Sequence, residues 1–73
     1  SMTEMVVALL MLVNGEIKEA RIQPGYKKCL EGARKARRGL KIGGNIKYSC
    51  IKSMAELEEN IDGSLSIKKL ILK

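Results

Sequence analysis

A run of nine apolar residues, Met5 to Val13, leads directly into an Asn14-Gly15 pair. An Asn-Gly pair between two extended segments favours a hairpin, because both central residues of a type I′ turn need positive φ. Residues 16–23 form the partner strand, whose imperfect alternation of apolar and polar residues is typical of a sheet edge. The apolar run does not alternate, so it predicts a central strand covered on both faces, one by a helix and the other by a further element or another subunit.

The next segment predicts a helix and a third strand. Pro24-Gly25 ends the hairpin, and residues 26–38 place apolar side chains on one helical face and charged ones on the other. Gly39 follows as a helix-terminating residue. After a loop, residues 46–51 alternate as in a half-buried strand. Sequential strands tend to be neighbours, which favours the spatial order 2-1-3.

The last part of the chain predicts a short helix and a final strand. Ser53-Met-Ala-Glu56 matches a capping box, so we expect a short helix to about Ile61. Asp62-Gly63 is expected to form a turn, and Ser66 to Leu72 either a fourth strand or an arm that pairs with another chain. The prediction is an α+β domain of residues 2–73 with a small antiparallel sheet and one main amphipathic helix on one face. Residues 53–73 are the part expected to take part in assembly, and Ser1 is interpreted as a remnant of tag cleavage.

The length of 73 residues indicates one small domain of marginal stability. A hydrophobic share of 45% is too high for a disordered chain. A core of this size benefits from a covalent link or from a partner subunit. We therefore expect either a cysteine bridge or a homo-oligomer, most simply a dimer.

The net charge of the protein lies in one segment. Between residues 27 and 41 there are seven basic residues and one acidic residue, which gives 7 − 1 = +6, equal to the net charge of the whole chain. The basic residues are Lys27, Lys28, Arg34, Lys35, Arg37, Arg38 and Lys41. Such a patch fits an anionic partner, either nucleic acid or an acidic protein, but it equally fits a solvated helix face. Without interleaved aromatic residues, nucleic acid would be bound through its phosphate backbone, in a salt-sensitive manner.

The two cysteines are predicted to face each other. Cys29 lies on the apolar face of the helix, and Cys50 on the strand face that carries Ile46 and Tyr48. A disulfide between them would join helix to sheet and stabilise the fold by roughly 3 kcal/mol. The alternative is two reduced, buried thiols, which is the ordinary state in the cytosol.

Catalysis and metal binding have little support in this sequence. The chain has no histidine, so the usual general base is missing, and two widely spaced cysteines are too few for a metal site. No Gly-Lys-Ser/Thr follows the glycines at 39, 43 and 44, so no phosphate loop is indicated. We expect neither an enzyme nor a cofactor.

The apolar run is too short to cross a membrane, since a spanning helix needs about 20 residues. Glu4 precedes it where a signal peptide would have basic residues. A cytoplasmic protein is therefore expected.

The order of these features is similar to that in a loose class of small uncharacterised bacteriophage proteins, notably from marine phages. The matching residues are Val6–Val13, Asn14-Gly15-Glu16, Cys29 and Tyr48-Ser49-Cys50. The resemblance covers about the first fifty residues and implies a hairpin–helix–strand core, a phage origin and a place in the host cytoplasm, without implying an activity.

Together, these features predict a small non-catalytic binding or accessory protein that uses the basic helix face on an anionic partner. The alternative is a structural protein whose main property is homo-oligomerisation through its apolar strands.

Overall fold

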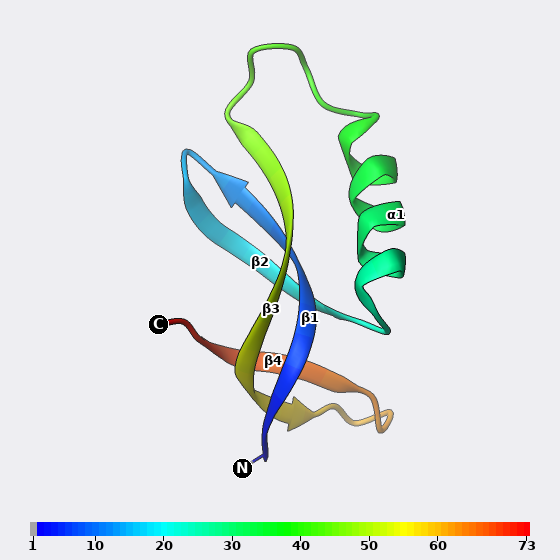
Figure 1. Ribbon diagram of the computed structural model, residues 1–73, viewed down its shortest axis with the longest axis vertical. Helices are drawn as coiled ribbons and strands as arrows, with labels where there is room; N and C mark the ends of the chain where they lie inside the picture. The colour runs from blue at the N-terminus through cyan, green and yellow to red at the C-terminus, as the bar shows by residue number, and fades with distance from the viewer. Residues whose placement is uncertain (1) are drawn as a thin grey trace.

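The computed structural model, which describes residues 2–73, contains one antiparallel sheet and one helix (Figure 1). In chain order the elements are β1 (Met2–Val13), β2 (Glu16–Gln23), α1 (Tyr26–Arg37), β3 (Ile46–Glu59) and β4 (Leu65–Ile71). The sheet order is β2-β1-β3-β4. The α+β class, the main helix and the 2-1-3 order of the first three strands are thus confirmed. β4 pairs with β3 of the same chain.

The first hairpin turns at Asn14 and Gly15, which have φ angles of 52° and 79°, as the Asn-Gly pair predicts. A β-bulge then explains the imperfect alternation of β2. The register shifts between Met11 and Leu12, which leaves Lys18 as the extra residue. The shift brings all three apolar residues of β2 to one face of the sheet: Ile17 is opposite Leu12, Ala20 opposite Leu10, and Ile22 opposite Ala8.

The predicted short helix from Ser53 to about Ile61 is wrong, because this segment is the second half of β3. Ser53, Ala55 and Leu57 are buried, and the residues between them are more exposed. This is the period of a strand, and β1 and β4 pair with the segment on its two sides. The match to a capping box is therefore coincidental, and sheet pairing overrides the local helix preference of the Ala-Glu-Leu-Glu sequence.

Both faces of β1 are covered in the middle of the strand, as predicted for a central strand. The inner face, defined by Val6, Ala8 and Leu10, is buried to 8%, 0% and 5% exposure. The sheet curls so that its two edge strands, β2 and β4, contact each other across this face. The inner cluster includes Val6, Ile22, Ala55, Leu57, Leu65, Ile67 and Leu70. The element that covers the second face of β1 is therefore the sheet itself rather than a subunit.

The outer face of the sheet carries the odd-numbered residues of β1, and α1 covers its upper half (Figure 1). A Cβ at Gly32 would lie 3.6 Å from Leu9 Cδ2, and Cys29 Sγ lies 3.6 Å from the carbonyl oxygen of Ala8. Cys29 and Ala33 have no exposed surface. Small residues on the inward side of α1 thus let its backbone approach the sheet closely.

The two hairpins share one construction, although the sequence shows no internal repeat. The β3–β4 register also shifts, between Glu56 and Leu57, and the extra residue is again a lysine, Lys68. Leu57 is opposite Ile67, just as Leu12 is opposite Ile17. Leu12 of β1 therefore corresponds to Leu57 of β3, and Val7, five residues before Leu12, corresponds to Lys52, five residues before Leu57.

Because Val7 and Lys52 are also each other's partners in the β1–β3 ladder, the registers relate the two hairpins by an approximate two-fold axis through this pair. The first hairpin continues into α1. Residues 2–73 contain no second helix that packs on the second hairpin.

Candidate functional site

The basic segment is carried by α1 and the loop after it, and two contacts with β3 hold this helix in place. Near its start, the sulfur atoms of Cys29 and Cys50 lie at disulfide-bonding distance, with the two Cα atoms 6.1 Å apart. Near its end, Arg37 Nη2 donates a hydrogen bond to the carbonyl oxygen of Tyr48 at 2.9 Å. The two anchors therefore reach β3 only two residues apart, one through the side chain of Cys50 and the other through the backbone carbonyl of Tyr48.

These anchors matter because α1 is weak as an isolated helix. It has 12 residues, Gly25 at its N-cap without a side-chain hydrogen bond, and no acidic residue in the first turn. Helices of this length are marginal in water on their own. The geometry of the basic residues is therefore set by the tertiary contacts of Cys29, Ala33 and Arg37. Sequence reasoning placed Arg37 in the basic patch and missed its anchoring role.

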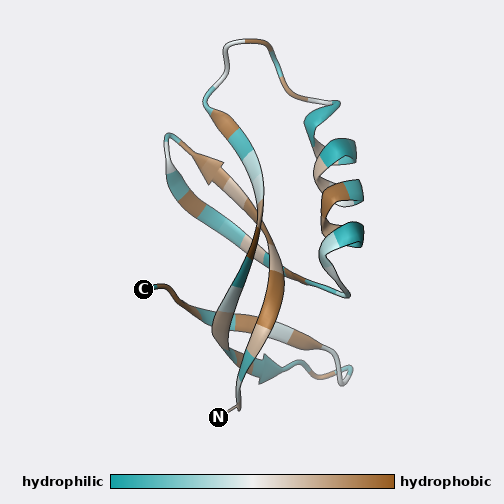
Figure 2. Ribbon diagram, in the orientation of Figure 1, coloured by the Kyte–Doolittle hydropathy of each residue, from teal (hydrophilic) through white to brown (hydrophobic). Residues whose placement is uncertain are grey.

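All seven predicted basic residues are exposed, and Figure 2 shows the side of α1 turned away from the sheet as predominantly hydrophilic. Lys28 forms an ion pair with Glu31, at 3.6 Å, and Arg37 is engaged with Tyr48. Within residues 2–73, the other five form no ion pair. They are Lys27, Arg34, Lys35, Arg38 and Lys41. The structure thus brings the predicted site residues together on one helix and the loop that follows it.

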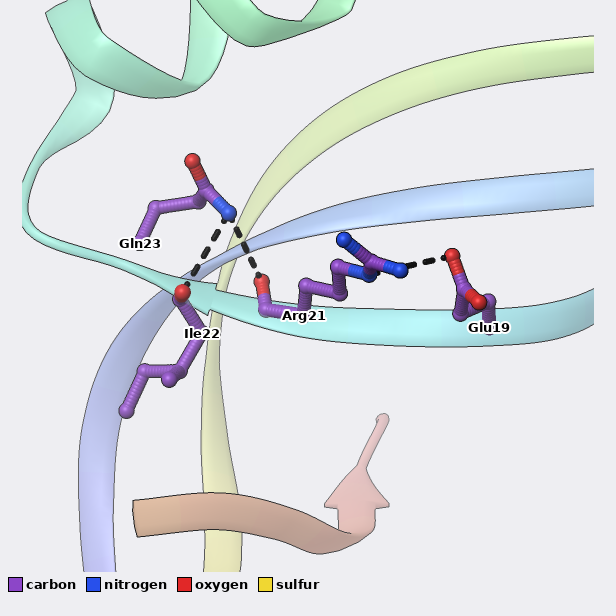
Figure 3. Close-up of polar contacts among 4 residues, drawn as sticks. All are labelled: Glu19, Arg21, Ile22 and Gln23. Atoms are coloured by element: carbon purple, nitrogen blue, oxygen red, sulfur yellow. Dashed lines mark hydrogen bonds and ion pairs between the residues drawn. The ribbon is translucent and has the colours of Figure 1, made fainter. Parts of the chain in front are cut away.

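The part of β2 beside the basic face of α1 adds no unpaired positive charge to that face (Figure 3). The guanidinium of Arg21 pairs with the carboxylate of Glu19 at 3.2 Å. Next to it, Gln23 Nε2 donates to the backbone carbonyl of Ile22 at 3.2 Å and lies 3.5 Å from that of Arg21. The basic face therefore ends at the boundary between α1 and β2.

Three of the eight acidic residues lie at the other end of the molecule. Glu58 and Glu59 end β3, and Asp62 lies in the turn before β4, at the opposite end of the long axis from the loop after α1 (Figure 1). The molecule extends 40 Å along this axis. With +6 on the α1 segment and 7 − 7 = 0 on the rest of the chain, the net positive charge of the protein is concentrated on one segment.

Two further findings concern chemistry and membranes. Within residues 2–73, no group of three or more His, Cys, Asp or Glu residues is arranged to hold a metal ion. No helix in that range is long and apolar enough to span a membrane.

The predicted proximity of Cys29 and Cys50 is confirmed by their geometry. Cys29 has no exposed surface, so its position at the start of a helix does not make it accessible to a reagent or substrate.

No family model, curated protein or solved structure matches this chain.

Proposed function

We propose that this protein is a small, non-catalytic binding protein that uses the outward face of α1 on the phosphate backbone of nucleic acid. The observation that supports this proposal is the display of the entire net charge on one anchored, exposed helix and its following loop. Six of the seven cationic side chains form no ion pair within residues 2–73, and of these six only Arg37 makes a hydrogen bond to the protein. When such a surface contacts phosphates, it releases the counterions that were condensed on the nucleic acid.

The shape of the site favours contacts with the backbone rather than with bases. A helix of this length extends about 18 Å, so its side chains can reach several successive phosphates. Lysine and arginine are the cationic groups of this surface, and such contacts fix position without reading sequence. We expect binding that is weak at physiological salt and nearly independent of nucleotide sequence.

Fluorescence anisotropy with a labelled duplex of about 20 base pairs, measured from about 25 to 300 mM salt, tests the proposal. The variant Arg34→Glu/Lys35→Glu/Arg38→Glu removes cations from the proposed site. The control Lys47→Glu/Lys69→Glu/Lys73→Glu changes the net charge equally and lies outside it. We expect the first variant to lose at least about tenfold in affinity at low salt, and the control less than about threefold.

Equal losses in both variants, or no duplex binding at the lowest salt concentration, would contradict the proposal. Binding of poly-glutamate in place of the duplex would identify an acidic protein as the partner class.

Homo-oligomerisation, the alternative function, stays a prediction. The inner face of β1 gives less reason for it than the sequence did, since Val6, Ala8 and Leu10 are buried within one chain. Both edge strands also carry a bulge with a lysine, Lys18 and Lys68, a device that discourages pairing between sheet edges. Light scattering after size exclusion, with and without reductant, measures the oligomeric state. The phage origin and the cytoplasmic location likewise stay predictions.

A further inference from the structure

An apolar patch on the outer face of the second hairpin is left uncovered. Met5 is opposite Met54 in the β1–β3 ladder, and Met54 is opposite Ile71 in the β3–β4 ladder, so the three side chains are neighbours on one face. Met5 is 61% exposed, Ile71 41%, and the adjacent Leu72 57%. These residues line a groove of about 250 Å³ together with Lys52, Ser53 and Lys73.

This patch on the second hairpin corresponds to the surface of the first hairpin on which α1 packs. The surface beneath α1 contains the Leu9–Cys50 pair. The approximate two-fold axis through Val7 and Lys52 exchanges that pair with Met54 and Met5, because Leu9 and Met54 lie at equal distances from the two bulges. The sheet therefore has two symmetry-related surfaces on which a helix can pack, and α1 covers one of them.

The charges around the uncovered groove differ from those around the surface beneath α1. Lys52 and Lys73 line the uncovered groove, and within residues 2–73 neither forms an ion pair. Lys52 and Val7 lie on the two-fold axis, between the two surfaces, so the difference in charge comes from Lys73, whose counterpart beside α1 is the uncharged Gln23. Two acidic residues are close to the groove: Glu56 pairs with Lys68 at 4.0 Å, and Glu4 lines the adjoining pocket with Met5 and Lys52. A lysine-rimmed groove would repel the basic α1 of a second copy and attract a helix that carries carboxylates.

We infer that this groove, lined by Met5, Met54, Ile71 and Leu72, binds an amphipathic helix of a partner protein with an apolar stripe flanked by acidic residues. An amphipathic helix docks by inserting side chains spaced at i, i+3, i+4 and i+7 into an apolar groove. Methionine suits such a surface because its unbranched thioether side chain adapts to different partners. The partner helix lies on the sheet as α1 does, at the position related by the two-fold axis.

The test is a titration of the full chain, labelled with ¹³C at the methionine methyl groups, followed by NMR. The probe is a synthetic helical peptide of about four turns, with leucines at helical spacing flanked by glutamates. A matched peptide replaces each glutamate with lysine. We expect the acidic peptide to shift the methyl signals of Met5 and Met54 saturably and to move that of Met11, which lies on the α1-covered half, much less.

Two variants assign the binding to the groove. Lys52→Glu/Lys73→Glu should weaken the acidic peptide at least about fivefold, and Arg34→Glu/Lys35→Glu less than about twofold. The backbone spectrum of each variant shows whether the fold is retained. The inference is overturned if the peptide perturbs α1 alone, if the lysine peptide binds equally well, or if no saturable shift occurs. Methyl shifts of Met5 and Met54 that depend on protein concentration alone would instead identify a second copy as the occupant.

Discussion

The β1–β2 hairpin carries α1 on its outer face above Leu9, whereas the β3–β4 hairpin leaves the equivalent surface around Met54 uncovered. The hairpins share a bulged edge strand with a lysine at the bulge. They differ in what stabilises them: the first has the helix and its two anchors to β3, and the second contributes Ala55, Leu57, Leu65, Ile67 and Leu70 to the inner cluster. One strand arrangement can thus bury its outer face beneath a local helix or leave that face exposed.

The largest expected effect comes from removing the link between α1 and β3. Cys29→Ala/Cys50→Ala should lower the free energy of unfolding by about 3 kcal/mol, measured by urea denaturation, because the cross-link spans 21 residues. Hydrogen exchange should show the loss of protection concentrated in α1, with a smaller loss in β4. Equal loss in both elements would mean that the two halves of the molecule unfold as one unit.

A matched pair of leucine substitutions compares the cores of the two hairpins. Leu57 is 3% exposed and its counterpart Leu12 is half-buried. Leu57→Ala should lower the free energy of unfolding by about 2.5 kcal/mol, and Leu12→Ala by about 1 kcal/mol, because the cost rises with the buried side-chain surface that is removed and with the cavity that remains. Thermal and urea denaturation measure both. If Leu12→Ala costs as much as Leu57→Ala, the inner cluster does not belong chiefly to the second hairpin.

A stabilising substitution tests how closely α1 packs on the first hairpin. A Cβ at Gly32 would lie 3.6 Å from Leu9 Cδ2 and 3.9 Å from Gln23 Oε1, which are ordinary contact distances. Gly32→Ala should therefore raise the free energy of unfolding by about 0.5–1 kcal/mol through its helix propensity. Gly39→Ala, beyond the helix and free of neighbours within 4 Å, is the control and should change little. A lower stability for Gly32→Ala would show that the helix has no room for a methyl group.

The smallest effect is a pH dependence confined to the second hairpin. Ser64 Oγ and the Ser64 backbone N–H both donate to Asp62 Oδ1, at 2.6 and 3.0 Å, and hold the pKa of Asp62 below its ordinary value of 3.8. The stabilisation is therefore present above that ordinary value and is lost as the pH falls through the lower, folded-state pKa.

A carboxyl NMR titration measures this pKa, and Asp62→Asn should remove the associated pH dependence of stability. The first turn has a neutral Asn45–Asn14 side-chain hydrogen bond of 3.1 Å and should show no such dependence. A pKa of 3.8 or higher for Asp62 would contradict the prediction.

Local sequence signals predicted much of the first hairpin and of α1. The Asn14-Gly15 turn depends on backbone conformations that few other residues adopt, so it is determined within the pair itself. The amphipathic pattern of residues 26–38 likewise predicted α1 to within one residue, and with it the outward direction of the basic side chains. These features could be predicted because each is decided by residues close together in the chain.

The segment from Ser53 to Glu59 could not be predicted in this way. Its Ala-Glu-Leu-Glu sequence is compatible with a helix, and the competing strand pattern is equally short. Pairing with residues 2–6 of β1 on one side and with β4 on the other decides between them, and these partners are far apart in the sequence. The β2 bulge was hidden for the same reason: an extra residue is visible only against a partner strand.

The sequence by itself determined the charge asymmetry, the first turn, the main helix and the central apolar strand, because composition and short-range periodicity decide them. The tertiary structure alone decided that β3 continues through Glu59, that the sheet curls to bury Val6, Ala8 and Leu10, and that Arg37 anchors α1. It also decided that, within residues 2–73, the helix covers the outer face of the first hairpin and leaves that of the second exposed. These outcomes depend on contacts between residues distant in the chain, whose favourable free energy appears only when the strands pair.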